Sequence, residues 1–158
     1  MKNIFKIISY PAIIILLSSC GFQQLNNISN SDIYIKEIQT EGDAKIAQII
    51  RNEIAISYDN ERNYPYNLKI NIKKDKTYKE KDISGKVKSY YLSVILDVEI
   101  LDKNWKILNN TNIGTKDSFN LSKNNSNNIV LEKKILENIS ISAAEKLSKY
   151  LNSYFENK

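Results

Sequence analysis

The chain has 158 residues, a formal net charge of +5, one cysteine and no histidine. Its length suits one domain of ordinary size. The absence of histidine excludes Ser-His-Asp and Cys-His catalytic centres and histidine metal ligands. The charge is well below that of a nucleic-acid-binding arm. We therefore expect no enzyme activity, cofactor, metal site or nucleic-acid partner.

The first 19 residues have the pattern of a secretion signal. Lys2 and Lys6 precede a short apolar run that ends in the lipobox Leu17-Ser18-Ser19-Cys20. A transmembrane anchor is the alternative, but it needs about 20 apolar residues, and Pro11 interrupts this shorter run. We predict cleavage before Cys20, acylation of its thiol with chains such as palmitate, and attachment to a membrane.

The mature chain is then expected to have three features. Loss of Lys2 and Lys6 lowers the formal charge from +5 to +3. Gly21 replaces the aspartate that commonly retains lipoproteins in the inner membrane, which favours the periplasmic side of the outer membrane. Residues 20–31 are polar and form a tether, and residues 32–158 form a single α/β domain.

Hydrophobic periodicity predicts the elements in the order strand, helix, three strands, helix. Residues 32–38 alternate as a short strand, and Gly42-Asp43 can cap an amphipathic helix that ends near Asp59-Asn60. A second strand starts near Pro65, and the charged residues 73–88 suggest a long hairpin connection or mobile strand ends.

The strongest strand signal covers residues 89–101, where even-numbered apolar residues share one face. A tight turn at Asp102-Lys103-Asn104 leads into a last strand from Trp105 to about Phe119, with a bulge expected near Gly114. A long helix follows from about 129 to 155, with an apolar stripe running from Ile135 to Tyr154.

These elements predict an α+β, two-layer sandwich, in which two helices pack on one face of a four-stranded mixed sheet. Neither helix is stable alone, so both must lay their stripes on the same sheet face. The first two strands should be parallel, because a helix connects them, and the later strands should form an antiparallel meander.

Two groups of residues suggest chemistry. Asp97 and Glu99 share a strand face, but a solvated or partner-facing surface is the simpler interpretation of this pair. The lysines crowd the second strand and its connection to the third, and they can hold phosphate as point charges or simply keep an exposed hairpin soluble. They are Lys69, Lys73, Lys74, Lys76, Lys79, Lys81, Lys86 and Lys88.

Three further features of the sequence occur together: Cys20-Gly21-Phe22 after the lipobox, a Tyr-x-Leu-x-Ile strand at 66–70, and the basic Lys86-Val87-Lys88 leading into the strand at 91–96. In these features the chain resembles the lipopolysaccharide-assembly lipoprotein family, LptE. Ser118-Phe119-Asn120 also resembles a Ser-aromatic-Asn sequence found before the last helix. The family usually has arginine in the basic stretch, and its last helix is Ala-rich rather than starting with Ile129-Val130-Leu131.

The resemblance implies an outer-membrane lipoprotein that plugs and helps to assemble the LptD β-barrel, which transports lipopolysaccharide to the cell surface. It also implies contact between lipopolysaccharide and Lys86 and Lys88, which match the family's basic stretch. The alternative is an adaptor lipoprotein of another envelope complex, such as a phospholipid-transport ABC system.

Overall fold

The computed structural model describes residues 35–54 and 66–156. In chain order they form β1 (Ile35–Gly42), α2 (Ala44–Glu53), β2 (Tyr66–Lys81), β3 (Val87–Leu101), β4 (Ile107–Asn120) and α3 (Asn125–Glu156). The predicted order of elements is confirmed. Several predictions lie outside the described residues: the signal segment 1–19, the tether 20–31 and the lipidation residue Cys20. Residues 55–65 also lie outside them.

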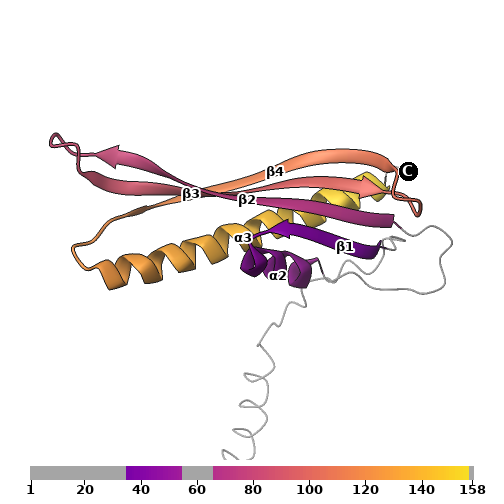
Figure 1. The fold of residues 1–158 in the computed structure, drawn as a ribbon, viewed down its shortest axis with the longest axis horizontal. Helices are drawn as coiled ribbons and strands as arrows, with labels where there is room; N and C mark the ends of the chain where they lie inside the picture. Colours follow the sequence, from indigo (N-terminus) through magenta and orange to yellow (C-terminus); the bar gives the residue numbers. More distant parts are fainter. Residues whose placement is uncertain (1–34, 55–65, 157–158) are drawn as a thin grey trace, which may run out of the picture. The chain divides into compact units, whose positions relative to one another are not determined.

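The four strands form one mixed sheet in the order β1-β2-β3-β4. β1 pairs with β2 in parallel, and β3 pairs with β2 and β4 in antiparallel fashion. Helices α2 and α3 lie on the same side of this sheet (Figure 1). The predicted fold class, an α+β sandwich with two helices on one face of a four-stranded mixed sheet, is confirmed. Among the helices that the structure describes, none is both long enough and apolar enough to cross a membrane.

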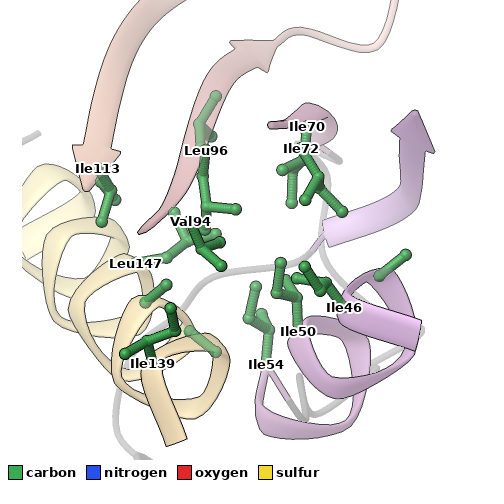
Figure 2. Packing of buried hydrophobic residues seen from close by; sticks show 14 of the residues in the cluster. Ile46, Ile50, Ile54, Ile70, Ile72, Val94, Leu96, Ile113, Ile139 and Leu147 are labelled. Atoms are coloured by element: carbon green, nitrogen blue, oxygen red, sulfur yellow. The ribbon is translucent and has the colours of Figure 1, made fainter. Parts of the chain in front are cut away.

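The core lies between the sheet and the two helices. Strand β3 supplies its centre, because the even-numbered residues from Leu92 to Ile100 are almost completely buried. Helix α2 contributes Ile46 and Ile50, and α3 contributes the predicted stripe, which is buried from Ile135 to Leu151 and half-buried at Tyr154. Figure 2 shows these aliphatic side chains meeting from both helices and from three strands. At about 25 cal/mol per Å² of apolar surface, this burial is the main term that stabilises the fold.

The start of α2 follows the predicted capping pattern. The Asp43 carboxylate accepts hydrogen bonds from the backbone N–H groups of Lys45 and Ile46, at 3.0 and 3.2 Å. These bonds satisfy amide groups that have no partner within the helix. Before the cap, Gly42 adopts φ +111° against Ile72 of β2. This close approach lets the chain turn from the sheet edge directly into the helix.

Two predictions about the strands are wrong in detail. Of the two alternatives for residues 73–88, the long connection is wrong and strand ends are found, because β2 continues to Lys81 and β3 begins at Val87, so that only a tight turn remains. The register of β4 against β3 is regular at Gly114, which pairs with Ile95. The irregularity lies instead between Ile100 and Leu101. The β2–β3 ladder continues through the polar residues 73–81, where the sequence has no alternation of apolar residues that would reveal a strand.

Candidate functional site: the basic β2–β3 hairpin

The predicted lipopolysaccharide-binding residues Lys86 and Lys88 lie at the end of the β2–β3 hairpin. Lys86 closes the turn and Lys88 is the second residue of β3, and both are exposed. Residues 79–88 contain four lysines, one glutamate and one aspartate, so this end carries a local charge of +2. The antiparallel register places Lys81 opposite Val87, between the two predicted residues.

The turn is held by Asp82. Its carboxylate accepts hydrogen bonds from the hydroxyl and backbone N–H groups of Ser84, at 2.6 and 2.9 Å, and from the Lys86 backbone N–H at 2.9 Å. These bonds, first among them that from the Ser84 hydroxyl, lower the pKa of Asp82, and the charge of Lys88 adds to the effect. The turn therefore uses the Lys86 backbone and leaves its ammonium group available.

Four of the other lysines have acidic partners. On the face turned to the helices, Lys74 pairs with Asp43 at 2.7 Å and Lys76 pairs with Glu132 at 2.6 Å. On the opposite face, two further pairs are Lys69–Glu41 at 3.3 Å and Lys73–Asp97 at 2.6 Å. These four lysines fasten elements of the fold to one another, and they are poor candidates for binding a ligand.

The lysines near the hairpin end have aromatic or neutral neighbours. Lys81 lies 4.1 Å from the ring centroid of Tyr78, and Lys79 lies 5.5 Å from that of Tyr91 while donating to the Ser118 hydroxyl. Cations over ring faces are attracted by the ring quadrupole. The ammonium groups of Lys79 and Lys81 therefore lie against tyrosine rings, and neither forms an ion pair with another described residue.

The sheet face turned away from the helices is polar and carries a shallow hollow. Its lining includes Asp97, Glu99, Asn112 and Lys69. Asp97 pairs with Lys73 and accepts a hydrogen bond from Asn112 at 2.6 Å, and the Lys73 contact is the main reason that its pKa lies below the ordinary value. A carboxylate held ionised in this way is unsuited to act as a general acid. No group of three or more potential metal ligands occurs among the described side chains.

Comparison with known proteins identifies the fold. No family model matches the chain, and no curated protein matches it at a significant level. The solved structures include rare lipoprotein B from Shewanella oneidensis, with 11% identity and a TM-score of 0.57 over 77% of this chain and 97% of that one. A minor lipoprotein from Acinetobacter baumannii has 14% identity and a TM-score of 0.59, covering 77% and 94% of the two chains.

A third similar structure is an uncharacterized lipoprotein B from Nitrosomonas europaea. It has 12% identity and a TM-score of 0.60, and the match covers 85% of this chain and 92% of that one. The three structures share nearly their whole length with this chain. The fold implied by the resemblance to LptE is therefore confirmed, since these structures have the rare lipoprotein B architecture.

Proposed function

We propose that this protein is an outer-membrane lipoprotein of the LptE type, anchored through acylated Cys20 on the periplasmic side. It plugs and helps to assemble an LptD-type β-barrel for lipopolysaccharide transport, and it has no catalytic role. The observation that carries the proposal is the shared fold with lipoproteins of the rare lipoprotein B type, together with a lipobox in this chain.

Three further observations support the proposal, the first two for the plug role and the third for lipopolysaccharide contact. The uncovered sheet face is polar, with ion pairs and a hollow that a surrounding protein wall can contact. Among the strands that the structure describes, β1 and β4 are the edges, and each has one side of its backbone without a neighbouring described strand. The side chains of Lys86 and Lys88 remain exposed at the hairpin end, where phosphate groups of lipopolysaccharide can approach them.

The barrel partner is tested by purification from membranes in mild detergent. The lipid-anchored protein should bring down a large outer-membrane β-barrel, and Cys20→Ala should abolish acylation. An inner-membrane transporter in place of the barrel would support the adaptor role, and acylation of the Cys20→Ala protein would disprove the predicted anchor.

The lipopolysaccharide contact is tested by charge reversal. Lys86→Glu combined with Lys88→Glu should weaken lipopolysaccharide binding, more strongly at low salt because the Debye length is about 8 Å at physiological ionic strength. The matched control is Lys133→Glu with Lys149→Glu, since both lysines are exposed on α3 and form no ion pair with a described residue. Equal losses in the two double variants would indicate nonspecific charge attraction and remove the site.

A further inference from the structure

The turn between β3 and β4 presents apolar side chains to solvent. Trp105 is 41% exposed, Ile107 53% and Leu108 38%. Ile107 pairs with Leu101, and Asn109 pairs with Ile100, so Leu108 is the extra residue of a β-bulge. Bulges re-aim side chains and are common where a strand edge has a function. The bulge adds a third exposed apolar side chain to the two beside it.

The backbone of this turn is strained at its tryptophan. Both hairpins have the same construction, in which an aspartate, Asp82 or Asp102, accepts hydrogen bonds from the backbone two and four residues later. The residue with positive φ is Gly85 in the first turn, at 81°, and Trp105 in the second, at 64°. Trp105 is the only described residue other than glycine with positive φ. A glycine would fit this position without strain, and such strain is concentrated at functional sites.

The same end of the sheet receives the chain from the predicted anchor. Ile35, the first residue of β1, pairs with Tyr66, and the next residue of β2, Asn67, pairs with Leu101 and donates to the Asp102 carbonyl oxygen at 3.0 Å. Figure 1 shows the start of β1 and the β3–β4 turn at one end of the sheet, away from the β2–β3 turn.

The length of the connecting chain favours membrane contact at this end. Fourteen residues, 21–34, lie between Cys20 and Ile35. Bond geometry limits the separation of Cys20 and Ile35 to about 50 Å, at roughly 3.5 Å per residue. The basic hairpin lies roughly 50 Å along β3 from the other turn, at about 3.4 Å per residue. An acylated Cys20 would therefore keep the Trp105 end of the sheet within about 50 Å of the bilayer, whereas the basic hairpin could lie up to about 100 Å from it.

We propose that Trp105, Ile107 and Leu108 insert into the headgroup region of an anionic lipid bilayer. Tryptophan suits this region, because its ring is apolar and its indole N–H is polar. Lys103 and Lys106 flank the tryptophan, form no ion pair with a described residue, and complement lipid phosphates. The orientation argument rests on the proposed anchor at Cys20, whereas the lipid contact itself needs no acyl chain.

Trp105 is the only tryptophan of the protein, so its fluorescence reports this contact directly. The probe is the mature chain with Cys20→Ser, mixed with vesicles of phosphatidylethanolamine and phosphatidylglycerol. Vesicles should shift the emission to shorter wavelength, and lipids brominated near the headgroup should quench it. Co-sedimentation should show about tenfold weaker binding for Trp105→Gly, which corresponds to roughly 1.4 kcal/mol.

Ile83→Ser provides the matched control, since Ile83 is fully exposed in the other hairpin turn. This variant should bind vesicles as the parent protein does. Vesicle binding without an emission shift, or equal weakening by Ile83→Ser and Trp105→Gly, would overturn the proposal. An emission shift produced only by a solubilised β-barrel would also overturn it and assign the turn to a protein surface. Acylation of Cys20 is measured separately on the lipidated protein, so failure of the anchor is distinguished from failure of the lipid contact.

Discussion

Gly42 and Gly85 provide a test of how the first strand is joined to the first helix. Both have positive φ, at 111° and 81°. A Cβ added to Gly42 would overlap the carbonyl oxygen of Ile72 on the neighbouring strand, whereas a Cβ on Gly85 would meet nothing within 4 Å. Alanine has a backbone penalty of at least about 1–2 kcal/mol at both positions, because L residues rarely adopt these φ values. Only Gly42→Ala adds a steric conflict with a backbone atom that is fixed in the sheet.

The difference between the two variants can be estimated. Overpacking typically costs about 1–3 kcal/mol, so Gly42→Ala should lose roughly 3 kcal/mol and Gly85→Ala roughly 1 kcal/mol. For a domain of this size each kcal/mol lowers Tm by about 4 °C. Thermal unfolding followed by circular dichroism measures both values. Equal losses in the two variants would refute the argument, because the overlap with Ile72 would then have no cost.

Three further predictions concern packing and charge. The pKa of Asp43 is lowered, chiefly by its hydrogen bond with Lys74. The ionised Asp43 carboxylate therefore stabilises the fold above the unfolded-state pKa of about 3.9, and this contribution is lost as pH falls through the lower folded-state pKa. Asp43→Asn should therefore reduce the loss of stability in acid, which urea unfolding at pH 2 to 6 would reveal, and an unchanged pH profile would contradict this. Ala143→Asp should cost on the order of 3–5 kcal/mol, because Ala143 is fully buried and the new carboxylate has no partner, so an unchanged Tm would place this helix face outside the core. Thr115→Val should cost about 1 kcal/mol in denaturant unfolding, because the Thr115 hydroxyl donates to the Ile139 carbonyl oxygen at 2.8 Å, and a gain in stability would mean that this bond contributes nothing.

Periodicity was sufficient to predict the core. Two patterns identified the buried faces of β3 and α3: the alternation in residues 89–101 and the helical spacing from Ile135 to Leu151. The apolar face of the sheet and the apolar stripe of the helix each need an apolar surface to cover them, and they cover one another. The parallel pairing of β1 with β2 followed from the helix that connects them. These features depend on residues near one another in the sequence.

The partners of the lysines could not be predicted in the same way. Lys73 reaches Asp97 because the register aligns Asn71 with Asp97 and places Lys73 two residues further along the strand. Lys76 reaches Glu132 because α3 crosses the sheet at that height, which no local pattern specifies. Eight lysines of similar appearance in the sequence therefore divide only in three dimensions into four with acidic partners and a group at the hairpin end.

The two hairpin turns differ in the residue that has positive φ, which is Gly85 in one and Trp105 in the other. Asp82 and Asp102 build equivalent turns, so the first hairpin shows which residue the backbone prefers at the position of positive φ. Glycine occupies it in the basic hairpin, and tryptophan occupies it beside the entry of the chain from Cys20. Folding alone favours glycine at both positions, and the proposed bilayer contact would account for the indole at the second. Basic charge at one end of the sheet and apolar surface at the other then suit two different environments, a phosphate-bearing ligand and a bilayer.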